Sequence, residues 1–356
     1  MKLLFFASDY NIGLSSLLTD ELVALHRNGI SLTAIAGDCE QEIGLTERIK
    51  DIPHYRIKGL DIHSNFKKLA NTIREIIESD NISVVHVQNN WQLALIVYVK
   101  YVLCKRVKIL YTLHAFRHNS PFKSIIAQVL IGTALLFFVD HIICMCSYLK
   151  KKFKLLSYKI TLLPLGISDS YFENAYSPCR TDGLHLVFPA QFRYGKNQDM
   201  LIKAFAEYIR RSGDEISTLT LPGSGELLDN MKSLAVNLGI TDRVYFPGQC
   251  KKIEIKNYYQ NCNIGIVSSN SETFGQSIVE PYVLGRCVLS RKVGIAPDII
   301  QNRYNGFLYD NQSDLVAILM WLSKDTSLIN IMGKHNFKDR FQFHWDIISK
   351  KYQDIL

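Results

Sequence analysis

Short runs of apolar residues alternate along the chain with segments in which apolar residues recur at helical spacing. The run Lys2–Ser8 (KLLFFAS) has the continuous apolar character of a strand that is buried on both faces. A polar loop at Asp9–Gly13 and a helical pattern over Ser15–Asn28 follow it. The next apolar run, Ile30–Ala36, completes a strand–loop–helix–strand unit. Such a unit is the opening of a doubly wound α/β fold.

The same alternation continues and predicts two sheets. In the first half, strands are predicted at Ile82–Val87, Lys108–Leu113, Asp140–Met145 and Ile160–Leu163, and helices at Phe66–Ser79 and Trp91–Tyr101. After the polar stretch Ser168–Gly183, strands are predicted at Leu184–Ala190, Ser217–Leu221 and Val244–Phe246, and helices at Met200–Arg211 and Asp229–Asn237. Because 356 residues exceed one ordinary core, we predict two α/β domains with their boundary in that polar stretch.

Composition is that of a soluble globular protein, with 47% hydrophobic and 21% charged residues. The eight cysteines are scattered, without a Cys-x-x-Cys pair or a zinc-ligand spacing, so we expect reduced thiols in a cytoplasmic protein. The apolar start Met1–Phe6 is too short for a signal peptide and continues into the first strand.

Basic charge is concentrated in the first half. Residues 100–159 carry eleven Lys and Arg against one acid, Asp140. The longest apolar run, Ile125–Val139, lies in the same region and is too short to cross a bilayer. It is either a buried helix or, beside this charge, part of a surface that rests on an anionic membrane. No nucleic-acid-binding module is visible, so nucleic acid is not an expected partner.

The stretch Ile264–Leu289 has the pattern of a ligand site. A buried strand is followed by a polar loop, by Gly275, and by a helix that starts near Gln276. A glycine before a helix N-terminus lets backbone N–H groups face an anion. Glu272 and Glu280 bracket this turn and can accept hydrogen bonds from sugar hydroxyls. The pattern suits a sugar linked to phosphate.

Further motifs precede and follow this stretch in a fixed order. Gln191–Gln198 follows a predicted strand, Pro222–Gly225 and Gly248 follow the next two, and Asn305–Gly306 opens a later one. With Glu272-x7-Glu280 they resemble family 4 of the retaining glycosyltransferases, which are two-domain GT-B enzymes that use nucleotide sugars.

The resemblance implies two Rossmann-like doubly wound domains that face each other across a cleft, with a C-terminal helix crossing back to the first. We accordingly expect an acceptor-binding domain at 1–167, a linker at 168–183, a nucleotide-sugar-binding domain at 184–340, and the returning helix at 341–356.

The resemblance also implies residue roles. Lys196 and Arg193 hold the donor diphosphate, although Gln191 occupies the usual place of the arginine. Glu280 takes the ribose hydroxyls and Glu272 the hydroxyls of the transferred sugar. His114, in Thr112-Leu113-His114, lies near the donor sugar and the leaving group. The remaining donor-binding residues are expected to be Gly13, Gly223, Gly248, Phe274, Gly275 and Gln276. His86, at another strand end, is expected beside the pocket.

The implied function is retaining transfer of a sugar from a nucleotide diphosphate sugar, UDP-linked rather than GDP-linked, to a lipid-linked glycan acceptor. This is the chemistry of O-antigen, lipopolysaccharide or capsule assembly at the inner face of the cytoplasmic membrane. No Asp-x-Asp pair occurs in the sequence, so neither a metal nor another cofactor is expected. Three alternatives stay open: an inverting GT-B enzyme, a sugar-nucleotide epimerase, and an inactive nucleotide-sugar-binding subunit of the same fold.

Overall fold

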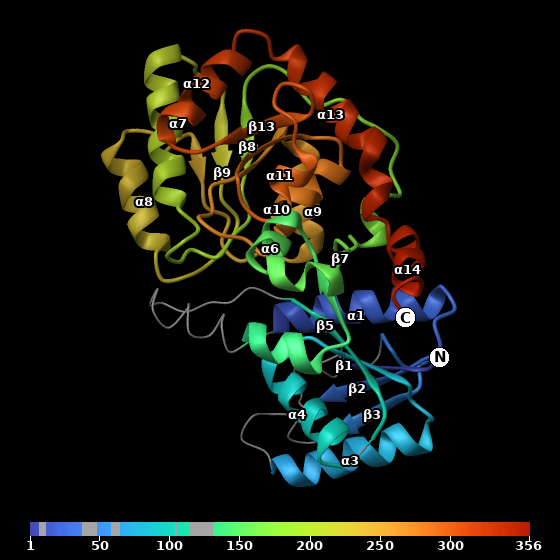
Figure 1. The fold of residues 1–356 in the computed structure, drawn as a ribbon. Coiled ribbons are helices and arrows are strands. Elements are labelled where there is room, and N and C mark those ends of the chain that lie inside the picture. The colour runs from blue at the N-terminus through green and yellow to red at the C-terminus, as the bar shows by residue number, and fades with distance from the viewer. Residues whose placement is uncertain (7–11, 38–47, 58–64, 104, 114–130) are drawn as a thin grey trace. The chain divides into compact units, whose positions relative to one another are not determined.

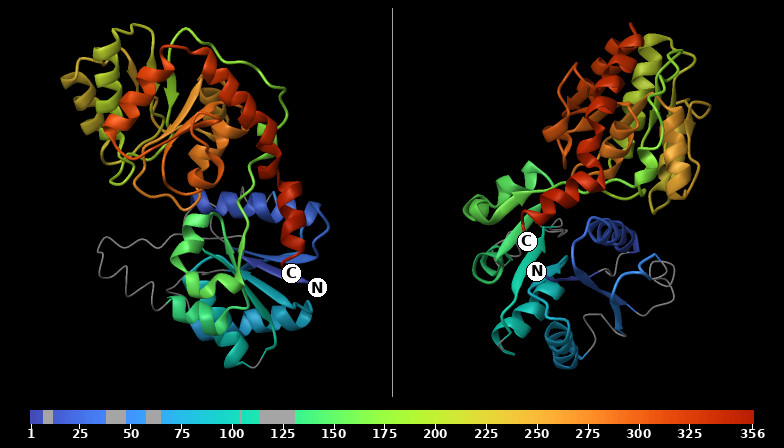
Figure 2. Two further views of the ribbon diagram at one scale, coloured as in Figure 1. Left: turned by 45° about the horizontal axis from the view of Figure 1, so that its top comes forward. Right: turned by 90° about the vertical axis from the view of Figure 1, so that its right-hand side faces the viewer.

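The computed structural model describes residues 1–6, 12–37, 48–57, 65–103, 105–113 and 131–356 (Figure 1). They form two compact units. Unit 1 comprises Met1–Gly166 and Trp345–Leu356, and unit 2 comprises Ile167–His344. Each unit has its own parallel sheet, with helices against both faces (Figure 2). This confirms the predicted fold class of two Rossmann-like domains.

Unit 1 contains a seven-stranded sheet in the order β3-β2-β1-β4-β5-β6-β7, and all of its pairings are parallel. The order reverses between β1 and β4, which is where open α/β sheets bind ligands. The strands are β1 (Leu3–Phe6), β2 (Leu32–Gly37), β3 (His54–Ile57), β4 (Val84–Val87), β5 (Lys108–Thr112), β6 (His141–Cys144) and β7 (Ile160–Leu162). The pattern did not predict β3, an edge strand whose side chains are all at least partly exposed.

The helical segments of unit 1 before the C-terminus are α1 (Ile12–Arg27), α3 (Phe66–Ser79), α4 (Asn90–Tyr101), residues 131–138, α6 (Ser147–Lys152) and the 3₁₀ segment η2 (Lys154–Lys159). Asparagine side chains cap two of them: Asn65 accepts from Lys68 N, and Asn89 from Gln92 N. Helix α1 begins at Ile12, so Gly13 lies in its first turn. The prediction that Gly13 belongs to the preceding loop is therefore wrong.

The apolar run Ile125–Val139 is described from residue 131 onward. Leu135 and Val139 are buried, but Phe137 is 67% exposed, and Leu136 and Phe138 are exposed as well. The interpretation of this run as a buried helix is therefore wrong for its described part, because only one side of the helix meets the core.

The C-terminal helix α14 (Trp345–Gln353) packs onto unit 1, as predicted. Trp345, Ile348 and Tyr352 are buried in the same core cluster as Leu22 of α1. Gly166 makes room for the helix, because a Cβ at this position would lie 2.2 Å from the Trp345 ring.

A buried polar network ties α14 to the sheet. A hydrogen bond of 2.7 Å joins the Tyr352 hydroxyl to His86 Nδ1, and another of 2.7 Å joins His86 Nε2 to the Thr112 hydroxyl. A carboxylate oxygen of Glu21 lies 4.0 Å from His86 Nδ1, and burial raises the pKa of Glu21 to about 8. His86 is thus a structural residue with partners at both ring nitrogens.

Unit 2 contains a six-stranded parallel sheet in the order β10-β9-β8-β11-β12-β13, which reverses between β8 and β11. Its strands are β8 (His185–Val187), β9 (Thr218–Thr220), β10 (Val244–Tyr245), β11 (Ile264–Val267), β12 (Cys287–Arg291) and β13 (Gly306–Tyr309). Its helical segments are η3 (Asp169–Tyr171), α7 (Gln198–Ser212), α8 (Leu228–Asn237), α9 (Lys252–Asn261), α10 (Gln276–Val283), α11 (Ala296–Ile299), α12 (Gln312–Leu322), α13 (Ser327–Asp339) and η4 (Arg340–Phe343).

Residues 168–183, which we expected to form a linker, pack onto unit 2. The Asn330 amide accepts from Cys179 N at 2.8 Å and donates to Cys179 O at 3.1 Å. The Tyr176 hydroxyl donates to Asn330 O at 2.9 Å. These contacts join residues about 150 positions apart. The local sequence pattern of residues 168–183 therefore could not predict them.

Among the cysteines that the structure describes, Cys144, Cys146, Cys179, Cys250, Cys262 and Cys287 are free thiols. Within the same residues, no single helix is both long and apolar enough to span a membrane. Among the described residues, one pair of helices, 312–322 and 327–343, is long and apolar enough when its two members are taken together, and the pair is bent by 106°.

Replacing Trp345 with alanine is expected to destabilise unit 1 by about 3–5 kcal/mol, because it removes a buried aromatic side chain and leaves a cavity. Hydrogen exchange should show loss of protection in β1 and β2 but not in β11 and β12. Ile347→Ala, on the same helix at a position 38% exposed, is the control and should change little. Equal loss of protection in both sheets would contradict the assignment of α14 to unit 1.

Candidate functional site

The turn from β11 into α10 is built by close packing. Gly265 of β11 lies directly under Pro281 of α10, since a Cβ on this glycine would approach the proline ring to 2.4 Å. Pro281 has no N–H to donate to the Ser277 carbonyl, and the Tyr259 hydroxyl donates to that carbonyl instead, at 3.3 Å. Gly275, with φ +94°, precedes the helix. The N-terminus of α10 therefore follows closely on a buried strand, as predicted.

Two loops meet where the strand order of unit 2 reverses. The loop after β8 is held to the loop after β11 by two hydrogen bonds: Ser268 Oγ donates to Lys196 O at 2.8 Å, and Asn270 N donates to Gly195 O at 2.8 Å. The Gln198 side chain closes the first loop by donating to Gln191 O at 3.0 Å. Both loops are thereby fixed at the edge of the sheet where its strands end, which is where open α/β sheets bind ligands.

This arrangement brings together Lys196 and Glu272, which are 76 positions apart in the sequence. The distance from Lys196 Nζ to Glu272 Oε1 is 2.5 Å, and the side chains are 14% and 18% exposed. A half-buried cation beside a carboxylate can neutralise an anionic group, while the carboxylate oxygens accept hydrogen bonds from hydroxyls.

Glu280 lies about one turn into α10. Its side chain is partly open to solvent, but the surrounding protein raises the pKa of the carboxyl to about 7 by desolvation, and the nearby charge of Lys252 opposes this rise. The exposed part of this carboxyl can accept hydrogen bonds from ligand hydroxyls.

Arg193 lies on the same loop as Lys196 and lines a cavity of about 230 Å³. Asn197 at the start of α7, Leu227 before α8 and Asn270 after β11 line it too. The expected role of Arg193 at the donor diphosphate stays a prediction.

The glycines expected at the donor site connect three strand ends. Gly223, after β9, has φ +149°, and a Cβ there would lie 2.0 Å from the Ala190 carbonyl oxygen after β8. Gly223 N donates to Gly248 O, after β10, at 2.7 Å. Both glycines thus allow backbone segments to meet at the edge of the sheet.

Phe274 and Gln276 flank Gly275. The Phe274 side chain is only 4% exposed and packs against Phe343, and its carbonyl accepts from Ile295 N at 2.9 Å. Phe274 thus belongs to the core of unit 2, whereas Gln276 opens α10 and is partly exposed.

The other expected site residues belong to unit 1. Gly13 lies in the first turn of α1, and His114 lies outside the described residues. Sequence reasoning did not consider Tyr171, which is 5% exposed; burial raises the pKa of its hydroxyl, and the charge of Glu280 raises it further. Its position in a polar stretch without periodicity gave no signal for a site residue.

Two family models match the chain in succession. "Glycosyltransferase Family 4" matches residues 13–171, and "Glycosyl transferases group 1" matches residues 176–339. The alpha-monoglucosyldiacylglycerol synthase of Streptococcus pneumoniae is 24% identical over 298 residues, covering 77% of this chain and 65% of the relative. The chain spans 40% to 65% of the length of three curated glycosyltransferases that it resembles.

Solved structures show the same fold. The structure of HepE from Anabaena with UDP and glucose has a TM-score of 0.78 at 18% identity, covering 99% of this chain and 98% of that one. The lipopolysaccharide outer core galactosyltransferase WaaB has a TM-score of 0.75 at 15% identity, covering 100% and 99%.

Replacing Glu280 with glutamine is expected to stabilise the protein at pH 8 and not at pH 5. Folding raises the pKa of Glu280 from about 4.5 to about 7, so the native state binds this proton more tightly, and stability is lost as pH rises across that window. At pH 8 the gain should be on the order of 1–3 kcal/mol.

Denaturant titrations at the two pH values measure this difference. Glu215→Gln, which removes an exposed carboxylate of the same unit, is the control and should show no such pH-dependent gain. A glutamine variant at position 280 that is less stable than the wild type at pH 8 would contradict the assigned desolvation.

Proposed function

We propose that this chain is a GT-B glycosyltransferase that transfers a sugar from a nucleotide diphosphate sugar to a glycan acceptor, because the family 4 and group 1 models match residues 13–171 and 176–339 in succession. The observation that carries this proposal is the contact between Lys196 and Glu272 where the strand order of unit 2 reverses. A cation and a carboxylate that lie together just before α10 support this proposal, because a cation can bind phosphate and a carboxylate can accept hydrogen bonds from hydroxyls.

In this proposal unit 2 binds the donor. Lys196 and Arg193 neutralise the diphosphate in place of a metal ion, with help from the backbone of Gly275 and Gln276. Glu280 accepts hydrogen bonds from the ribose, and Glu272 from the transferred sugar. The proposed donor is a UDP-sugar, a choice supported by the UDP and glucose in the HepE structure.

The proposed transfer retains the configuration of the sugar. The acceptor hydroxyl attacks the anomeric carbon on the face from which the nucleoside diphosphate leaves. The departing phosphate oxygen takes the proton of that hydroxyl, and the cations stabilise the negative charge that the diphosphate gains. In this proposal His114 and Gly13 keep the roles that the resemblance implies.

Lys196→Ala is expected to reduce turnover on the order of 10²-fold or more, the effect of losing one preorganised group that stabilises developing negative charge. A panel of UDP- and GDP-sugars is first screened by thermal stabilisation, since a ligand at 100 times its dissociation constant adds about 2.7 kcal/mol. Transfer or hydrolysis is then measured with and without EDTA.

Lys203→Ala is the matched control, because Lys203 lies on α7 and pairs with Asp199 at the surface. Sensitivity to EDTA would contradict the metal-independent scheme. Binding without any turnover would favour the alternative of an inactive binding subunit, and conversion of the nucleotide sugar to its epimer would favour an epimerase.

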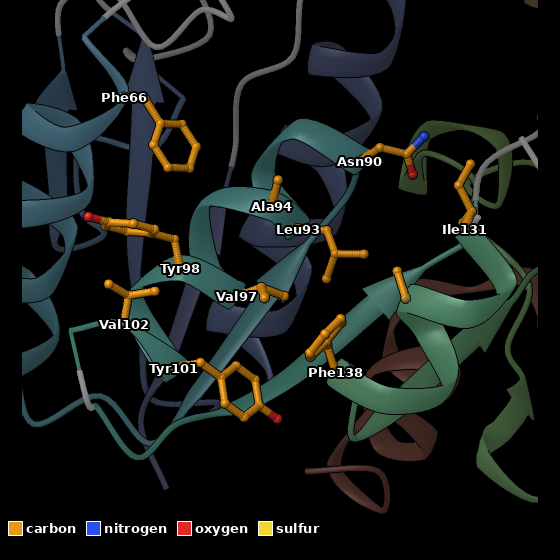
Figure 3. Close-up of a pocket in the computed structure, with 11 residues that line it drawn as sticks. Phe66, Asn90, Leu93, Ala94, Val97, Tyr98, Tyr101, Val102, Ile131 and Phe138 are labelled. Carbon is orange, nitrogen blue, oxygen red and sulfur yellow. The ribbon is translucent and has the colours of Figure 1, made fainter.

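We further propose that unit 1 rests on an anionic membrane and meets a lipid-linked acceptor there, in assembly of a surface polysaccharide such as O-antigen. A groove of about 640 Å³ lies beside α4 and residues 131–138, whose Tyr101 and Phe138 rings are in edge contact (Figure 3). Leu93, Val97 and Tyr98 line it on one side, and Ile131 and Phe138 on the other. Around it, Tyr101, Val102 and Phe137 expose 51%, 57% and 67% of their surface. Exposed apolar groups of this kind mark interaction surfaces.

The basic residues of this region divide into two groups. Some have structural partners: Lys100 pairs with Asp140 at 2.7 Å, and Lys159 Nζ caps the end of helix 131–138 by donating to Leu136 O at 2.6 Å and to Val139 O at 2.7 Å. Others are exposed beside apolar side chains that are exposed too: Lys151 and Lys154 accompany Leu155, exposed by 89%, and Tyr158, exposed by 70%. The second group supports the membrane proposal, because apolar and cationic groups together suit an anionic interface.

Replacing Lys151 and Lys154 together with glutamine should weaken binding to anionic vesicles about thirtyfold, since each basic residue near such a surface contributes about 1 kcal/mol. Cosedimentation with phosphatidylglycerol and phosphatidylcholine vesicles, at low and high salt, measures this. Lys334→Gln with Lys338→Gln, both exposed on α13 of unit 2, is the control. Binding that is independent of lipid charge and salt concentration would contradict the electrostatic proposal.

A further inference from the structure

The segment that opens unit 2 is held in place by a buried lysine. Lys256 of α9 is only 7% exposed, and its Nζ donates to Ser170 O in η3 at 2.6 Å. The same Nζ lies 5.9 Å from the centroid of the Tyr171 ring. The position of the Tyr171 side chain is thereby fixed within unit 2.

The Tyr171 hydroxyl is enclosed without a partner. Tyr171 is 5% exposed, and among the described residues nothing lies within hydrogen-bond distance of its oxygen. Leaving a buried hydroxyl unsatisfied is unfavourable, so such groups call for an explanation. A ligand-bound state in which this hydroxyl donates to an acceptor would be stabilised relative to the ligand-free state.

Helix α9 lies against both Tyr171 and the start of α10. Its Lys256 Nζ lies 5.9 Å from the centroid of the Tyr171 ring, and its Tyr259 hydroxyl contacts Ser277 O, one turn before Glu280. Glu280 is therefore the candidate acceptor. The electrostatics agree with this choice, because burial raises the pKa of Tyr171 and the charge of Glu280 raises it further. The charge of Glu280 also raises the pKa of Tyr259 of α9, but the Tyr259 hydroxyl already donates to Ser277 O at 3.3 Å. The charge of Lys252 favours the ionised form of the Glu280 carboxyl.

We propose that Tyr171 is a positioning residue of the ribose pocket, whose hydroxyl donates to the Glu280 carboxylate when a nucleoside diphosphate is bound. A carboxylate has about four lone-pair sites, so Glu280 can accept from Tyr171 and from ribose hydroxyls together. The tyrosine keeps its proton, and the hydrogen bond orients the carboxylate and holds it ionised. This role rests on the proposed function, because it presumes that Glu280 holds the ribose.

Tyr171→Phe separates this role from a merely structural one. In the ligand-free protein the variant should keep or raise the melting temperature, because it removes a hydroxyl that has no partner. Its affinity for the ribonucleotide should nevertheless fall about tenfold, the effect of losing one hydrogen bond to a charged group. A structural hydroxyl would instead lower the melting temperature and leave affinity unchanged.

Calorimetric titration with UDP, GDP and their 2′-deoxy forms measures both nucleotide affinity and preference for ribose. Tyr171→Phe should reduce the preference for ribose, and in a Glu280→Gln background the same change should have no further effect. Tyr259→Phe is the control: it removes a buried hydroxyl near the same carboxyl, and it should lower stability while leaving the preference for ribose unchanged.

Two results would overturn the inference while leaving the proposed function intact: an unchanged preference for ribose in Tyr171→Phe, or additive losses in the double variant. If the wild type bound neither UDP nor GDP, or bound the ribo and 2′-deoxy forms equally, the ribose role of Glu280 itself would fail, and the inference with it.

Discussion

The contact between the loop after β8 and the loop after β11 is the constraint on which the candidate site depends. It consists of two hydrogen bonds to backbone carbonyls, from Ser268 Oγ to Lys196 O and from Asn270 N to Gly195 O. Parallel strand order makes it possible, because β8 and β11 are neighbours and their carboxyl ends emerge at the same edge. Once the loops are joined, the Lys196 side chain lies where Glu272 can meet it. The chemistry of the site is therefore a property of two loops held by one sheet.

Around this contact, unit 2 retains groups that are unfavourable for stability alone. Desolvation raises the pKa of Glu280 to about 7, and the Tyr171 hydroxyl is buried without an acceptor among the described residues. Both lie in surroundings that are otherwise tightly packed, with Gly265 beneath Pro281 and Lys256 anchoring Ser170. Such uncompensated polar groups concentrate at functional sites, where a ligand supplies the missing interaction.

Unit 1 differs from unit 2 in the polar groups that it buries and in the apolar groups that it exposes. Its interior contains a polar network in which His86 has partners on both ring nitrogens, and Tyr352 brings the C-terminal helix into that network. Its surface, however, leaves Phe137 and Leu155 largely exposed next to lysines. The first feature stabilises the unit, and the second is typical of an interaction surface.

The sequence by itself determined the fold class and the positions of most elements, because buried parallel strands and amphipathic helices have local periodicities. Helix α3 begins and ends where the pattern predicts, at Phe66 and Ser79, and α10 begins at Gln276 as expected. Motif order also pointed to Lys196, Glu272 and Glu280 as members of one site.

What the sequence could not specify was contact between distant residues. The pairing of Lys196 with Glu272, the packing of residues 168–183 onto unit 2, and the burial of Tyr171 near Glu280 arise only when the sheet brings separate segments together. Tertiary structure likewise decided that one side of helix 131–138 stays exposed, since hydrophobicity alone does not show which apolar side chains find a core.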